Sequence, residues 1–199
     1  MSRVKCKKLQ IQYISRERLI RYKNYKEYLM NIKFSRDFYI PLSVVEVSFR
    51  NSLNQFYTEK IGENWLEQNS ILQPNAQKSI SNSKNILKQQ KKIISQDNLI
   101  AELSFGFWVK LLTKVYSRYL RYNDLKQIFP NLPSKKDKSI NRHFIFTKLN
   151  NIRLFRNKVF HHDKIISKVE YQNMMDEIYE VLGYFDDKIV KITKELNDE

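Results

Sequence analysis

The apolar residues of this chain recur at steps of three and four, the spacing that places side chains on one face of an α-helix. The clearest example is LSVVEVSFRNSLNQFYTEKIG, residues 42–62. Four apolar positions there form one stripe at steps of four, four and three: Val45, Phe49, Leu53 and Phe56. Gly62 follows the last turn, and glycine commonly lies just beyond a helix end. We therefore expect a buried helix that ends at Gly62.

Helical spacing also extends over four other segments. Residues 15–33 combine spaced Leu and Tyr with a strongly basic remainder, which predicts one amphipathic helix. Residues 75–95 have a thin apolar edge on a surface rich in Lys, Gln, Asn and Ser, which is typical of a solvated helix. The two long segments near the C-terminal end, 140–162 and 169–196, each predict one long helix.

Helix breakers are scarce, with three Gly and four Pro in 199 residues. The most aromatic segment, residues 103–122, predicts a pair of helices packed on the core, and residues 129–139 form the clearest loop because they contain two prolines and a cluster of charges. We expect an all-α protein of five to seven helices in one bundle, organised as a single domain over residues 1–199.

The net charge of +15, from 36 Lys and Arg against 21 Asp and Glu, indicates which partners the chain can bind. Such a balance favours a polyanion, because neutralising phosphates releases condensed counterions. Nucleic acid is the leading candidate, ahead of an anionic membrane surface. Basic residues concentrate in the range 3–26 and acidic ones in 176–199, so we expect phosphate contacts towards the basic end.

A single cysteine, Cys6, excludes an internal disulfide or a cysteine-based metal cluster, so we expect a free thiol in a reducing cytoplasm. The first residues lack the apolar core of a secretory signal. No apolar run approaches the ~18 residues needed to span a bilayer. The expectation is a cytoplasmic protein without membrane partners, and the chemistry considered next requires no cofactor or metal.

The stretch RLFRNKVFHHDK, residues 153–164, places polar chemistry in an otherwise apolar helix. The core stripe of that helix includes an arginine: Ile145, Leu149, Ile152, Arg156 and Val159. The adjacent stripe becomes polar towards the helix end: Phe146, Asn150, Arg153, Asn157 and His161. An unpaired buried guanidinium is costly, so Arg156 must face a carboxylate, a phosphate or a water-filled cleft. The internal candidate is Glu46, on a polar stripe that borders the first core: Glu46, Arg50, Asn54 and Tyr57.

Two interpretations of Arg156 and His161 remain open from the residues alone. Arg156 and Glu46 could form only a structural ion pair, with His161 at the negative end of the helix dipole. Alternatively, histidine moves protons, arginine binds phosphate and asparagine orients either group, which suffices for metal-independent RNA cleavage by a ribose 2′-hydroxyl. Five residues turn the two side chains about 140° apart on a helix, so either the helix ends between them or two copies meet across a two-fold axis.

These motifs together resemble the Abi-like (abortive infection, AbiD/AbiF-type) branch of the HEPN ribonuclease superfamily. The RxxxxH string from Arg156 to His161 is preceded, in the family's order, by FYIPLSVVEVSFRNSLN at 38–54, ENWL at 63–66 and SFGFWVKLLTK at 104–114. The resemblance spans residues 15–185. It implies an HEPN-like helical bundle with additional helices and a homodimer whose two RxxxxH helices form one composite cleft. It also implies metal-independent endoribonuclease activity in bacterial anti-phage defence or a toxin-type system.

The resemblance also assigns roles by position. It implies three catalytic residues: Arg156, His161 and Asn157. A second group is expected to shape the cleft or bind RNA: Glu46, Arg50, Asn51, Arg153, Lys158 and His162. His162 lies outside the hexapeptide pattern, and the beginning of the next loop is its preferred interpretation. An antitoxin protein or a noncoding RNA is a possible regulator.

Two other classes are compatible with part of this pattern. A non-catalytic helical RNA-binding or regulatory module would keep the motif as a structural ion pair, and net charge does not separate it from a nuclease. A DNA-binding regulator fits the charge and the helices, but no segment has the short recognition helix, tight turn and base-reading residues that such a protein requires.

Overall fold

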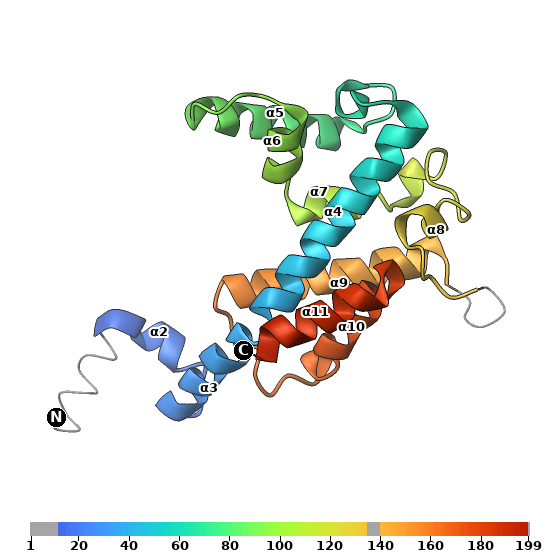
Figure 1. The fold of residues 1–199 in the computed structure, drawn as a ribbon. Coiled ribbons are helices and arrows are strands. Elements are labelled where there is room, and N and C mark those ends of the chain that lie inside the picture. Colours follow the sequence, from blue (N-terminus) through green and yellow to red (C-terminus); the bar gives the residue numbers. More distant parts are fainter. Residues whose placement is uncertain (1–11, 135–139, 199) are drawn as a thin grey trace.

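The computed structural model describes residues 12–134 and 140–198, and the regular elements in these ranges are all helical, which confirms the all-α class (Figure 1). The α-helices are α2 (Arg16–Leu19), α3 (Tyr25–Arg36), α4 (Tyr39–Ile61), α5 (Pro74–Gln89), α6 (Gln96–Glu102), α7 (Phe105–Lys110), α8 (Leu125–Ile128), α9 (Arg142–Phe160), α10 (Met174–Phe185) and α11 (Asp187–Asp198). Three short 3-10 helices lie between them: η1 (Trp65–Glu67), η2 (Lys114–Tyr116) and η3 (Val169–Tyr171).

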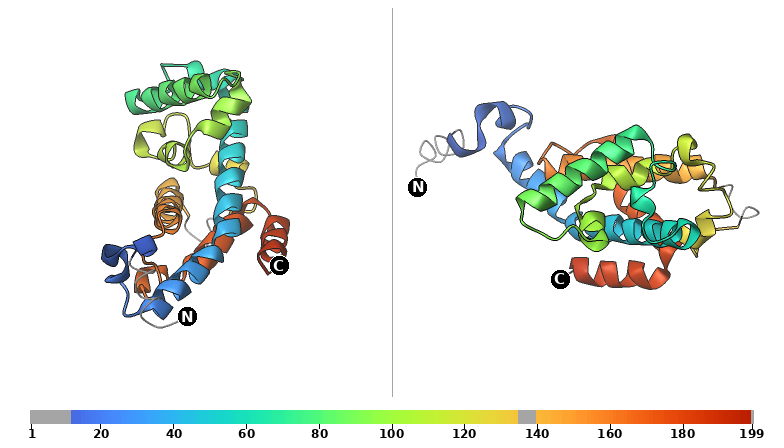
Figure 2. Two further views of the ribbon diagram at one scale, coloured as in Figure 1. Left: turned by 90° about the vertical axis from the view of Figure 1, so that its left-hand side faces the viewer. Right: turned by 90° about the horizontal axis from the view of Figure 1, so that it is seen from above.

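Helix α4 is the long central element, and the other helices are arranged along it (Figure 1). Helices α5 and α6 lie at one end of α4, and α2 and α3 lie at the other. Helices α7, α8, α10 and α11 all contact α4, while α9 contacts α7 and α10. Figure 2 shows α9 and α11 on opposite sides of α4. The candidate residues of α9 therefore lie on the side of α4 that faces away from α11.

The core is built on the apolar stripe that the sequence predicts for α4. All four predicted positions are buried, as is Tyr57. Phe49 stacks on Phe129 with ring centroids 6.0 Å apart, and it meets the edge of Phe105 at 6.3 Å. A fully buried side chain of this size contributes about 1.5–3 kcal/mol relative to an exposed one, so the stripe is a large part of the stability. Gly62 caps α4 with a φ of 122°, as its position predicts.

Two segments predicted as single helices are each divided in the structure. The helix expected over 15–33 separates into α2 and α3, because the Glu27 backbone N–H donates to Asn24 Oδ1 (2.9 Å) and starts a new helix there. The helix expected over 169–196 becomes η3, α10 and α11, with an extended Asp186 whose carboxylate accepts from the Lys188 N–H (2.8 Å). The predicted count of five to seven helices is therefore wrong, since ten α-helices lie within the described ranges.

Residues 75–95 and 103–122 pack as the sequence predicts, but the helices in the second of these segments are shorter than expected. Helix α5 is mostly solvated and buries Ile80 and Leu87, as predicted for the lysine-rich segment. The aromatic segment packs on the core through Phe105, Phe107 and Trp108, but its regular structure is limited to the short α7 and η2 instead of two full helices. Cys6 and the charged part of the predicted loop, residues 135–139, lie outside the described residues.

Across residues 12–134 and 140–198, no helix has both the length and the apolar character needed to cross a bilayer.

The end of α4 generates a first prediction. Gly62 combines a φ of 122° with a ψ of 164°, a conformation that L-residues avoid, while a Cβ placed there would have no atom within 4 Å. The Gly62→Ala variant should therefore lose about 1–3 kcal/mol of unfolding free energy through backbone strain alone. The matched control is Gly183→Ala in α10, where the added Cβ would come no closer than 3.8 Å to its neighbours. Chemical denaturation should show Gly183→Ala unchanged or up to ~1 kcal/mol more stable; equal stability of both variants would contradict the strain.

Candidate functional site at the end of helix α9

Helix α9 presents its apolar face to the core, but that face differs by one position from the predicted one. The buried residues are Ile145, Leu149, Ile152, Phe155 and Val159. Phe155 occupies the core position that the sequence assigns to Arg156, because its ring packs against Phe38 (4.7 Å) and Tyr171 (4.8 Å). Arg156 instead lies at the border of the core, with 32% of its side chain exposed. The prediction of Arg156 as a fully inward residue is thus wrong, although the guanidinium still faces another helix.

The partner of Arg156 is the glutamate that the sequence predicts. Arg156 Nε lies 3.2 Å from Glu46 Oε2 on α4, and the glutamate side chain is 19% exposed. The Arg156 Nε is buried and makes no hydrogen bond, so the contact is an ion pair held by proximity rather than a directed bond. The guanidinium carbon also lies 4.3 Å from the centre of the Phe160 ring, which in turn packs on Tyr39 at 5.7 Å. Glu46 and Phe160 therefore hold the guanidinium between α4 and the last turn of α9.

The end of α9 separates the two candidate catalytic side chains. The helix ends at Phe160, and His161 is the C-cap, with its backbone N–H donating to Asn157 O (2.9 Å). His162 has a φ of 54°, its N–H donates to Val159 O (3.0 Å), and the Asp163 N–H donates to Lys158 O (2.9 Å). These bonds form a Schellman motif with His162 in the left-handed position. The helix thus ends between Arg156 and His161, and the His161 side chain is exposed at the C-terminal end of α9.

Two of the residues expected to support the cleft belong to this helix end. Lys158 Nζ lies 3.0 Å from Asp163 Oδ2 across the Schellman turn. This hydrogen bond is the main reason why the pKa of the Asp163 carboxyl is lowered. His162 begins the loop after α9, which agrees with its preferred interpretation, and its exposed side chain lines a shallow hollow with Tyr28 and Arg18.

A buried asparagine that sequence reasoning missed anchors the loop after the histidines. Asn31 on α3 is fully buried, and its Nδ2 donates to Asp163 O (3.1 Å). Its Oδ1 accepts from the backbone N–H groups of Ile165 (2.8 Å) and Ile166 (3.0 Å). The only signal in the sequence was an uncharged amide between Met30 and Ile32. One side chain thereby satisfies three backbone groups on both sides of Lys164.

Basic residues of the N-terminal segment reinforce the same loop. Arg18 Nη1 donates to His162 O (2.9 Å), and Lys164 Nζ lies 2.9 Å from Glu27 Oε1. The hydrogen bond from Lys164 is the largest of the effects that lower the pKa of the Glu27 carboxyl. Part of the basic charge near this end, expected from the sequence to contact phosphate, therefore has a structural role in holding the end of α9 against α2 and α3.

The other predicted residues of α4 are directed away from Arg156. Arg50 Nη1 donates to Ala101 O (3.4 Å) at the end of α6, and its Nε lies 3.5 Å from Asn51 Oδ1. Asn51 is exposed. Asn54 Oδ1 accepts from Trp65 Nε1 (3.0 Å), which ties the ENWL segment to α4. Arg50 and Asn54 thus connect neighbouring elements, and only Glu46 of this stripe reaches Arg156.

The polar stripe of α9 forms as predicted, and it faces a different neighbour from the one that Arg156 contacts. Asn150, Arg153 and Asn157 are partly buried along one face, and His161 follows at its exposed end. Arg153 donates to Asn150 Oδ1 from Nε (3.1 Å) and Nη2 (2.9 Å), and it lies beside Gly106 of α7. The structure therefore directs Arg153 to α7 and Arg156 to α4.

A site for a metal would require a cluster of ligating side chains. Within residues 12–134 and 140–198, no three His, Cys, Asp or Glu side chains gather closely enough to hold an ion. The chain matches no protein-family model, no curated protein and no solved structure. The candidate site is therefore defined by the geometry around Glu46, Arg156 and His161.

The anchoring asparagine generates the second prediction. Replacing Asn31 by alanine leaves the backbone N–H groups of Ile165 and Ile166 and the carbonyl of Asp163 without their partner, so the free energy of unfolding should fall by about 2–4 kcal/mol. Hydrogen exchange at the two amides should accelerate. Asn85→Ala, at an exposed position of α5, should change neither quantity. Wild-type protection of Ile165 and Ile166 in the Asn31→Ala variant would show that this side chain does not hold the loop.

Proposed function

We propose that this protein is an endoribonuclease that acts at the end of α9 without a metal. The observation that carries the proposal is the partly exposed side chain of Arg156, whose guanidinium is held 3.2 Å from Glu46 and against Phe160, five residues before the exposed imidazole of His161. A cation that is fixed but not fully covered can contact a phosphate, and an exposed histidine at a helix end can exchange protons with solvent and substrate. The net charge of +15 supports a polyanionic substrate.

The proposed reaction uses the ribose of the RNA itself. His161 accepts the proton of a 2′-hydroxyl, whose oxygen then attacks the adjacent phosphorus. Arg156 stabilises the negative charge that develops on the phosphoryl oxygens, and Asn157, one turn before His161, orients either the imidazole or the phosphate. The bond from phosphorus to the 5′-oxygen breaks, that oxygen takes up a proton from solvent water, and His161 afterwards returns its proton to solvent. The products carry a 2′,3′-cyclic phosphate and a free 5′-hydroxyl, and DNA is not a substrate because it lacks the attacking group.

We also propose that two copies of the chain complete the cleft. Arg156 is directed to α4, whereas His161 projects into solvent from the helix end. Exposed apolar side chains lie on or next to this region, namely Leu154 and Phe160 on α9 and Tyr39 on α4. A two-fold pairing would bring the Arg156 of one protomer towards the His161 of its partner. The resemblance to Abi-like HEPN ribonucleases extends the proposal to a bundle of that type, to defence against phage and to restraint by an antitoxin protein or a noncoding RNA.

A non-catalytic RNA-binding module is the second candidate, and the ion pair between Glu46 and Arg156 is the observation that favours it. In that case the pair would only join α4 to α9. The two functions differ in what His161 does, because an exposed histidine contributes little to such a joint.

The third prediction separates these functions. Purified protein in EDTA should cleave single-stranded RNA to products with 2′,3′-cyclic phosphate ends, and both Arg156→Ala and His161→Ala should lower the rate by ~100-fold or more. His143→Ala is the matched control, since His143 is an exposed histidine at the opposite end of α9. Circular dichroism should show that all three variants remain folded, and the two active-site variants should also relieve growth arrest in cells. Intact RNA with every protein, together with unchanged growth arrest for His161→Ala, would refute the nuclease.

The fourth prediction tests the composite cleft. Arg156→Ala and His161→Ala proteins should each be inactive, yet an equimolar mixture should recover about a quarter of wild-type activity. Half of the dimers are then mixed, and one of the two clefts in each mixed dimer has both side chains. The control is Arg156→Ala mixed with the double variant, which should recover nothing. A monomer in sedimentation at micromolar concentration, with and without RNA, would contradict the shared cleft.

A further inference from the structure

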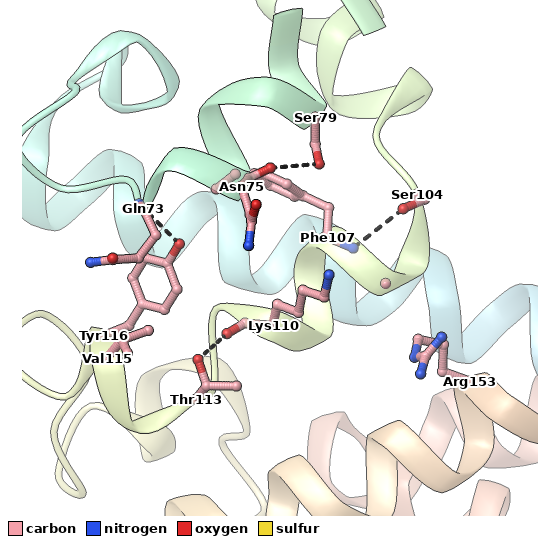
Figure 3. A pocket seen from close by; sticks show the side chains of 12 residues that line it. Gln73, Asn75, Ser79, Ser104, Phe107, Lys110, Thr113, Val115, Tyr116 and Arg153 are labelled. Carbon is pink, nitrogen blue, oxygen red and sulfur yellow. Dashed lines mark hydrogen bonds between the residues drawn. The ribbon is translucent and has the colours of Figure 1, made fainter. Parts of the chain in front are cut away.

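A pocket of about 680 Å³ lies between the first turns of α5, helix α7 and η2 (Figure 3). Helix α9 contributes one residue to its wall, Arg153, whose side chain is seen on the right of the view. The volume is typical of sites for small ligands and is sufficient for a nucleotide. The pocket is distinct from the contact between Glu46 and Arg156, because Arg153 is directed to α7 and Arg156 to α4.

The charge of the pocket selects an anion. Its charged lining residues are Lys110 and Arg153, and no carboxylate lines it. Within the described residues Lys110 makes no ion pair, and the hydrogen-bond acceptor of Arg153 is the neutral Asn150. Two cations without a negative partner at one cavity favour a phosphate, and a guanidinium can bind it through two nitrogens.

The rest of the lining suits a nucleobase. The side-chain amides of Gln73 and Asn75 line the pocket and make no hydrogen bond within the described chain, so they can pair with the donors and acceptors of a base edge. Val115 provides an apolar wall on the same side as Tyr116. Recognition of RNA in single strands commonly combines amide contacts to base edges with a cation on the backbone.

Helix α9 connects this pocket to the proposed cleavage site. Arg153, Asn157 and His161 lie on one face at steps of four, so the axial separation from Arg153 to His161 is about 12 Å. A few nucleotides of a single strand cover that distance. A strand with its reacting phosphate at His161 can therefore place a neighbouring nucleotide in the pocket beside Arg153 and Lys110.

We infer that the pocket between α5, α7 and Arg153 binds one nucleotide of single-stranded RNA, a few positions from the bond that is cut, and so determines where the chain cuts. The identity of the strand rests on the proposed function, whereas binding in the pocket does not require cleavage. Lys110 and Arg153 bind the phosphate, and Gln73 and Asn75 contact the base.

The fifth prediction measures binding without cleavage. In the His161→Ala background, fluorescein-labelled single-stranded RNA oligomers of uridine, of adenosine and of mixed sequence are titrated at several salt concentrations. Adding Lys110→Gln and Arg153→Gln together should weaken binding about tenfold and lower the salt slope by ~0.7 for each phosphate that is no longer neutralised. Asn75→Ala should instead alter the ratio of affinities between the oligomers. Lys110→Gln alone should also weaken binding, and misfolding cannot explain that loss of affinity because Lys110 is exposed.

The matched control is Lys188→Gln together with Lys191→Gln on α11, which removes two charges, as the double pocket variant does, from the opposite side of α4 and should leave the affinity unchanged. With His161 intact, the Lys110→Gln and Arg153→Gln variant should redistribute the cleavage positions. If the pocket variant and the α11 control have the same affinity for RNA, the pocket is not a nucleotide site, even where the wild type cleaves RNA. If the variant loses affinity and the wild type cleaves nothing, the pocket stands and the nuclease does not.

Discussion

Burial of the apolar face of α4 is the constraint on which the rest of the molecule depends. That face runs from Leu42 to Tyr57 without a charged residue, and four other helices pack on α4. A carboxylate adjacent to such a face must lie at its border, because a buried unpaired charge would cost more than the packing returns. Glu46 follows the fully buried Val45 and is at that border. Apolar packing places α9 beside α4 and so brings Arg156 to Glu46. The geometry of the candidate site is therefore set by the core.

The end of α9 depends on a second, polar constraint. A helix terminus leaves carbonyl groups without partners, and here a Schellman turn through His162 satisfies two of them. The chain then leaves α9 through a loop that Asn31 holds by three hydrogen bonds and that Arg18 and Lys164 tie to the N-terminal helices. His162 has the left-handed backbone conformation that glycine adopts more easily than histidine. The contacts that Asn31, Arg18 and Lys164 make at this loop compensate for the unfavourable conformation. In the proposed enzyme, this support would fix the direction of His161.

Sequence periodicity was informative wherever one side of a helix meets the core along its whole length. It predicted the α4 stripe, the end of that helix at Gly62, and Glu46 as the partner of Arg156, all of which the structure contains. It was wrong where a single side chain starts a new helix, as Asn24 does before α3 and Asp186 does before α11. A capping side chain leaves the spacing of the apolar positions unchanged, so the hydrophobic pattern does not show the break. It was also wrong by one position on α9, where Phe155 and not Arg156 enters the core. Steps of three and four from Ile152 allow either Phe155 or Arg156 to be the next core residue. The aromatic contacts of Phe155 with Phe38 and Tyr171 determine that Phe155 is buried.

The helical class, the basic character, the central helix and the candidate site residues could all be predicted from the sequence, since these follow from composition and from local spacing along one helix. How the candidate residues are distributed among neighbouring helices depends on the tertiary packing. Arg153 and Arg156 are three positions apart in the chain, yet one lines a pocket with residues of α5, α7 and η2 and the other meets Glu46 on α4. Asn31 shows the same limit, because its partners are more than 130 residues away. Contacts of this kind depend on how the helices pack in three dimensions, and spacing along a single helix carries no information about them.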